Sequence, residues 1–164
     1  MSNAEHTQSL VSAAIAPAHP SHGADRTKDI IETRTVIYGV VVGVIQAISP
    51  LGFWWLAPKT VYALGLTLIA AVYIGFSVAD GRGHVIAIES GVAALFVVVA
   101  AAGVTGSAWL LVLGLAGHGL KDLWQHRTQF VPNTRWWPPF CATVDFVAAG
   151  ILAGAVLTGV SFHG

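Results

Sequence analysis

Charged residues are scarce in this sequence. They make up 10% of its 164 residues, whereas a typical soluble domain contains about 25%. Eight acidic and eight basic side chains cannot cover the surface of a soluble globule of this size. This scarcity excludes an ordinary soluble enzyme and a disordered chain. The formal net charge of zero also excludes a basic nucleic-acid-binding protein, so we expect no nucleic-acid partner.

Cysteine is almost absent as well. Cys141 is the single cysteine, so the chain cannot form an internal disulfide. The N-terminus lacks the basic residues that open a signal peptide, because no lysine or arginine precedes Arg26. We interpret residues 1–34 as a polar, partly disordered cytoplasmic arm. The remaining residues, 35–164, are predicted to form a transmembrane helical domain.

Long apolar runs are abundant, since 55% of the residues are hydrophobic and the mean hydropathy is +0.70. A helix needs about 20 apolar residues to cross the hydrocarbon core of a membrane. Five runs have a suitable length: 35–57, 60–79, 84–104, 108–126 and 139–161. They predict an all-α integral membrane bundle of five transmembrane helices. A second possibility is four helices plus a re-entrant segment, because Ser49-Pro50 interrupts the first run.

The basic residues predict an orientation. With five spans, seven of the eight bases lie on the side of the N-terminal arm, and only Lys59 lies on the other side. Cytoplasmic loops carry an excess of lysine and arginine. We therefore predict a multi-pass protein of the inner (plasma) membrane with a cytoplasmic N-terminus and an external C-terminus. The lipid bilayer is its expected surrounding.

Ionisable side chains inside the predicted spans require an explanation. Each costs about 2.5–3.5 kcal/mol at the centre of a span on insertion scales. At about 1.5 Å rise per residue, the ionisable side chains of three spans lie at a similar depth in the cytoplasmic half of the membrane. We infer a polar pocket that opens toward the cytoplasm and is formed by Glu89, His118, Asp122, His126 and Asp145.

Two kinds of chemistry fit these side chains. Glu89, His118, Asp122 and Asp145 are candidate catalytic residues for acid–base chemistry, because a carboxyl group in an apolar pocket can act as an acid beside a histidine base. Alternatively, carboxylate and imidazole groups ligate divalent zinc or iron. The candidate metal ligands are His118, Asp122, His126 and Glu89, three of which recur at four-residue intervals on one helix.

Other side chains near this depth are candidates for binding a substrate. Tyr73 lies near the end of the second span, and Cys141 lies one turn before Asp145. Arg82 and His84 lie at the predicted mouth of the pocket. We regard these four as candidate substrate-binding residues.

The stretch from His118 to Asp145 reads HGLKDLWQHRTQFVPNTRWWPPFCATVD. Its HxxxDxxxHR…FCxxxD arrangement resembles a pattern in small uncharacterised bacterial integral membrane proteins. The resemblance covers about 28 of the 164 residues. It implies a bacterial membrane protein and no particular activity.

We hypothesise that the chain is a small membrane-embedded enzyme that acts on a lipophilic small molecule. A proton-coupled transporter or channel subunit is the alternative, because acid and histidine chains also relay protons. A structural or accessory subunit without catalysis is the third possibility. Gly39 and Gly43 form a small-xxx-small pair in the first span, which suggests a homo-oligomer.

Overall fold

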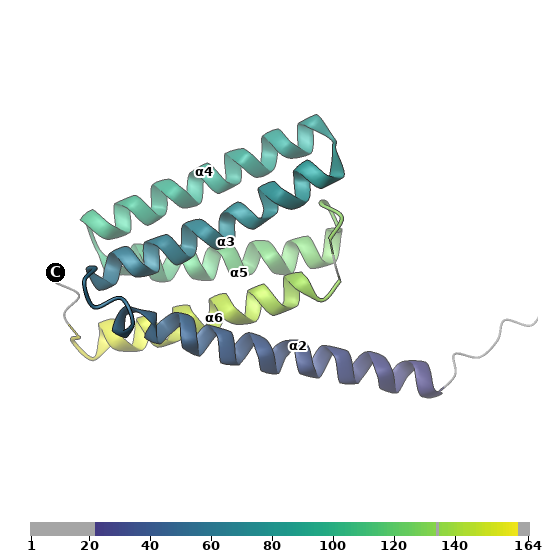
Figure 1. Cartoon of the computed structure of the whole chain (residues 1–164), viewed down its shortest axis with the longest axis horizontal. Coiled ribbons are helices and arrows are strands. Elements are labelled where there is room, and N and C mark those ends of the chain that lie inside the picture. Colours follow the sequence, from purple (N-terminus) through teal and green to yellow (C-terminus); the bar gives the residue numbers. More distant parts are fainter. Residues whose placement is uncertain (1–21, 134, 161–164) are drawn as a thin grey trace, which may run out of the picture. The chain divides into compact units, whose positions relative to one another are not determined.

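The computed structural model describes residues 22–133 and 135–160, with side chains from residue 32 onward. The chain divides into two units, one ending at Glu32 and one formed by residues 33–164. The helices of the second unit are shown in Figure 1. No strand occurs in the described ranges, which contain five α-helices and one short 3-10 helix: α2 (His22–Ile48), η1 (Ser49–Leu51), α3 (Pro58–Asp80), α4 (Gly83–Thr105), α5 (Ala108–Thr128) and α6 (Trp137–Leu157).

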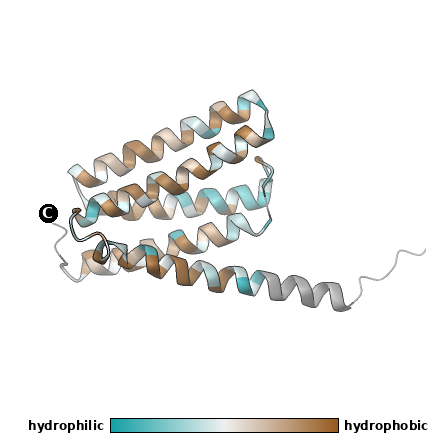
Figure 2. Ribbon diagram, in the orientation of Figure 1, coloured by the Kyte–Doolittle hydropathy of each residue, from teal (hydrophilic) through white to brown (hydrophobic). Residues whose placement is uncertain are grey.

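Four stretches are long and apolar enough to cross a membrane: Glu32–Leu51, Pro58–Asp80, Gly83–Thr105 and Trp137–Leu157. These helices fit the predicted all-α membrane bundle. The fifth predicted span, 108–126, is the helix α5 but is not one of the four. The polar second half of α5 lowers its hydropathy, and this end of the helix is hydrophilic in Figure 2.

The first predicted span differs most from the helix observed. We expected residues 35–57 to form it, but α2 begins at His22 and ends at Ile48, followed by η1. Pro50 has no backbone N–H to continue the helix, so the chain leaves it there. The part of the predicted arm at residues 22–34 is helical, whereas residues 1–21 lie outside the described residues.

α5 is the central helix, since it packs against α3, α4 and α6 (Figure 1). Short connections join its neighbours. Gly81 ends α3 with a φ of +79°, a left-handed conformation that glycine adopts at little cost. The Ser107 side chain caps α5 by accepting a hydrogen bond from the Trp109 N–H at 3.3 Å. Arg82 donates to the Phe130 carbonyl at 2.7 Å and thereby joins the α3–α4 turn to the loop after α5.

Apolar side chains face outward on all five helices, as expected for a protein surrounded by lipid. They include Ile37, Ile45, Leu68, Val98, Leu113 and Ile151. Among the residues whose side chains are described, the buried charged ones all belong to α4, α5 and α6. Three buried acidic side chains, those of Glu89, Asp122 and Asp145, therefore lie in the interior, and the surface supplies the apolar area that a bilayer would cover.

The glycine pair of α2 packs against α6 of the same chain. A Cβ atom on Gly39 would lie 2.7 Å from Thr143 Cβ, and one on Gly43 would lie 2.8 Å from Val147 Cβ. The small residues thus permit close approach of two helices within one subunit. The face that suggested a homo-oligomer is covered by α6.

We expect Gly43→Leu to destabilise the protein, because its side chain would collide with Val147. Overpacking of this kind costs about 1–3 kcal/mol. Gly75→Leu is the matched control, since nothing lies within 4 Å of a Cβ atom there. Thermal unfolding in detergent should show a lower midpoint for Gly43→Leu only. Equal midpoints for both variants would contradict the α2–α6 contact.

Candidate functional site

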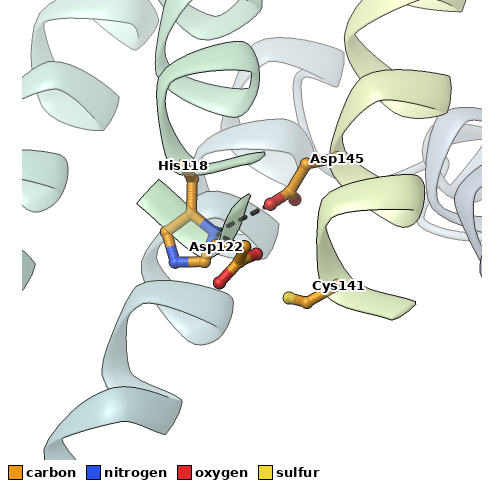
Figure 3. Close-up of side chains that lie close together, drawn as sticks. All are labelled: His118, Asp122, Cys141 and Asp145. Atoms are coloured by element: carbon orange, nitrogen blue, oxygen red, sulfur yellow. Dashed lines mark hydrogen bonds and ion pairs between the residues drawn. The ribbon is translucent and has the colours of Figure 1, made fainter. Parts of the chain in front are cut away.

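Four side chains that can ligate a metal ion converge between α5 and α6. They are His118 and Asp122 of α5, and Cys141 and Asp145 of α6. Their candidate ligand atoms lie within 4.8 Å of one another, and all four residues are buried. Figure 3 shows the two helices presenting these side chains to one another. We call this group the His–Asp–Cys cluster.

His118 is held by a carboxylate on the facing helix. Its Nδ1 lies 2.7 Å from Asp145 Oδ2 and 3.4 Å from Asp122 Oδ2. A carboxylate only accepts hydrogen bonds, so the proton of a neutral His118 ring must lie on Nδ1 to make the shorter contact. The rings of Phe96 and Tyr73 pack against the imidazole at centroid distances of 5.1 and 6.1 Å. These contacts restrict the orientation of the ring.

Asp122 is the least satisfied member of the cluster. Its side chain is 0% exposed, and neither carboxylate oxygen has a hydrogen-bond partner among the described residues. The same holds for Asp145 Oδ1, His118 Nε2 and the Tyr73 hydroxyl. An unsatisfied buried polar group costs about 1–3 kcal/mol, and more if it is charged. Five such atoms in one place are unusual for a purely structural cluster.

A second buried ion pair lies beside the cluster. Lys121 Nζ of α5 donates to Glu89 Oε2 of α4 at 2.7 Å. The ammonium group also lies 3.2 Å from the centroid of the Tyr73 ring, which is a close cation–π contact. The Lys121 side chain is 13% exposed and that of Glu89 is 2% exposed. The two charges neutralise one another, so this ion pair adds no net charge beside the cluster.

The helices approach closely at the cluster because α5 has a glycine there. A Cβ atom on Gly119 would lie 3.3 Å from Asp145 Cβ and 3.1 Å from the Phe146 ring. Both contacts are tighter than most real Cβ contacts. Gly119 therefore brings the backbone of α5 near enough to α6 for His118 and Asp145 to bond directly.

The structure brings together most, but not all, of the residues that the sequence nominated. His118, Asp122, Asp145 and Cys141 form the cluster. Glu89 lies beside it through Lys121, and Tyr73 packs on both His118 and Lys121. The remaining three nominated side chains are exposed and make no contact with the cluster that the structure records: Arg82, His84 and His126.

Sequence reasoning missed two features. Lys121 was expected only among the bases at the cytoplasmic side, but its ammonium group turns inward to Glu89. Gln125 is fully buried, and its Nε2 donates to the Val131 carbonyl at 2.7 Å, which holds the loop after α5. The i, i+4 spacing of Lys121 and Gln125 was the available signal, because it places both on one face of α5.

Comparison of the chain with protein-family models, curated protein sequences and solved structures gives no match.

Proposed function

We propose that this multi-pass membrane protein is an enzyme that acts on a lipophilic small molecule at the His–Asp–Cys cluster. The observation that carries the proposal is Asp122, a fully buried carboxylate without a hydrogen-bond partner among the described residues. A group that is so costly to bury is better explained by a chemical role than by packing. His118 and Asp145 support it by presenting a positioned nitrogen and a second carboxylate.

The position of the cluster favours chemistry at one end of the bundle over transport through it. Asp122 precedes the end of α5 by six residues, or about 9 Å, and Asp145 follows the start of α6 by eight residues, or about 12 Å. The main apolar core instead contains Leu66, Leu111 and Leu152, each 0% exposed. A proton relay across the membrane needs polar groups along its whole length, whereas the Tyr62 hydroxyl, which donates to the Ala47 carbonyl at 2.6 Å, is the single polar side-chain group among the described buried residues of this core. The transporter alternative therefore has less support.

The proposal is tested by extracting and profiling lipophilic molecules from membranes that contain the protein. We expect the wild type to deplete one species and accumulate another, relative to membranes without it. Asp122→Asn and Asp145→Asn should abolish this change, because each removes a carboxylate of the cluster. Glu32→Gln, which alters an exposed acid of α2, should leave it intact. A profile that is identical for the wild type and Asp122→Asn would overturn the proposal.

A further inference from the structure

We infer that the His–Asp–Cys cluster binds one divalent transition-metal ion of the zinc type. The inference deepens the proposed function and rests on the same site, but it names a cofactor that the proposal leaves open. Its ligands are His118, Asp122 and Asp145, with the Cys141 sulfur in the fourth position. One imidazole, two carboxylates and one thiol match the nitrogen, oxygen and sulfur ligands that zinc accepts.

The charges of the buried groups point to a dication. Lys121 and Glu89 compensate one another at 2.7 Å. Two carboxylates then remain, those of Asp122 and Asp145, and among the described residues the basic side chain within 4 Å of both is His118. The two positive charges of a divalent ion would neutralise both carboxylates. A single proton on His118 would neutralise one carboxylate and leave one negative charge buried. Uncompensated buried charge costs several kcal/mol.

The spacing of the donor atoms is close to that of a tetrahedral site. Zinc–nitrogen and zinc–oxygen bonds of about 2.0–2.2 Å place neighbouring ligand atoms about 3.3–3.6 Å apart. His118 Nδ1 and Asp122 Oδ2 are 3.4 Å apart, within this range. Nδ1 and Asp145 Oδ2 are 2.7 Å apart because a hydrogen bond joins them. A metal ion bound to Nδ1 would displace this proton and leave the neutral ring with its N–H on Nε2. The two ligand atoms would then have to separate by about 0.6 Å.

The unsatisfied atoms provide the independent support. Asp122 is completely buried, neither of its oxygens has a hydrogen-bond partner among the described residues, and it lies in the cluster. A metal ion would satisfy this carboxylate. If Cys141 binds as a thiolate it adds one negative charge.

The ligand set is tested by metal binding to the detergent-purified full-length chain, stripped with chelator and carrying no histidine tag. We expect equilibrium dialysis against Zn²⁺ to give one ion per chain. Asp122→Asn and Asp145→Asn should weaken binding by at least about tenfold. His126→Gln should bind as the wild type does, because this side chain is exposed and does not belong to the cluster. Circular dichroism and size exclusion establish that each variant is folded.

Cobalt reports on the fourth ligand. Reloading with Co²⁺ should give visible d–d absorption of a tetrahedral site and a near-ultraviolet thiolate-to-cobalt band that Cys141→Ser lacks. A folded wild type that binds neither ion overturns the inference, as does binding that is as tight in Asp122→Asn as in the wild type or is lost in His126→Gln. An unchanged band in Cys141→Ser overturns the assignment of the sulfur.

The two proposals fail separately. A chain that binds no metal but changes the lipophilic profile in an Asp122-dependent manner overturns the metal site and retains the enzyme. A chain that binds metal without changing that profile retains the metal site and overturns the enzyme.

Discussion

Lys121→Met is expected to lower the free energy of unfolding by about 3–5 kcal/mol, because it leaves the Glu89 carboxylate buried without its partner. Glu89 is 2% exposed, and Lys121 Nζ is the hydrogen-bond donor that the structure records for it. The substitution also removes the ammonium group from the Tyr73 ring. Chemical denaturation in mixed micelles would measure the loss.

A double substitution separates the buried charge from packing. Adding Glu89→Gln to Lys121→Met removes the unpaired charge, so most of the lost stability should return. Lys59→Met is the matched control, since that lysine is half-buried and makes an exposed hydrogen bond to the Gly106 carbonyl at 3.0 Å. We expect it to cost less than about 1 kcal/mol. A similarly small cost for Lys121→Met would show that water or lipid headgroups solvate Glu89.

Asp122→Leu is expected to act in the opposite direction. With chelator present, it should raise the free energy of unfolding by about 1–4 kcal/mol, because an apolar side chain of similar size replaces a buried carboxylate without hydrogen bonds. The same variant should lose the proposed activity and the proposed metal. Such a gain in stability at the expense of function is typical of residues retained for chemistry.

Asp145→Leu provides the contrast within the same cluster. It removes the acceptor of the 2.7 Å hydrogen bond from His118 Nδ1. An unsatisfied N–H then remains buried, so stability should fall by about 1–3 kcal/mol. Opposite signs for the two variants in the same melting experiment would establish that Asp122 and Asp145 differ in role. Equal losses of stability in the two variants would mean that the Asp122 carboxylate has a stabilising partner in the folded protein.

The helices were largely predictable because apolar runs of membrane length leave few alternatives. The predicted runs 60–79, 84–104 and 108–126 lie within α3, α4 and α5, respectively. The start of α2 was not predictable from hydropathy, because a polar segment can still be helical. The partner of the Gly39 and Gly43 face was not predictable either, since close helix packing has the same pattern within and between chains.

The members of the cluster were predictable to different extents. His118 and Asp122 follow from their four-residue spacing on one helix, a rotation of about 40°. His126 was nominated on the same argument, but eight residues rotate it by about 80° from His118, and its side chain is exposed. Lys121 was harder, because a lysine near a helix end can equally extend toward headgroups. The Lys121 side chain turns inward because Glu89 lies opposite it on α4, and that position is known only from the structure.

The central position of α5 has a consequence for how the protein is made. α5 is not among the helices apolar enough to cross a membrane by composition, and its buried face includes His118, Asp122 and Gln125. During synthesis it would enter lipid poorly by itself. His118 acquires its hydrogen-bond partner only when α6, which supplies Asp145, has also been translated. We therefore expect α5 to be integrated together with α6, as a late hairpin whose biogenesis depends on the completed cluster.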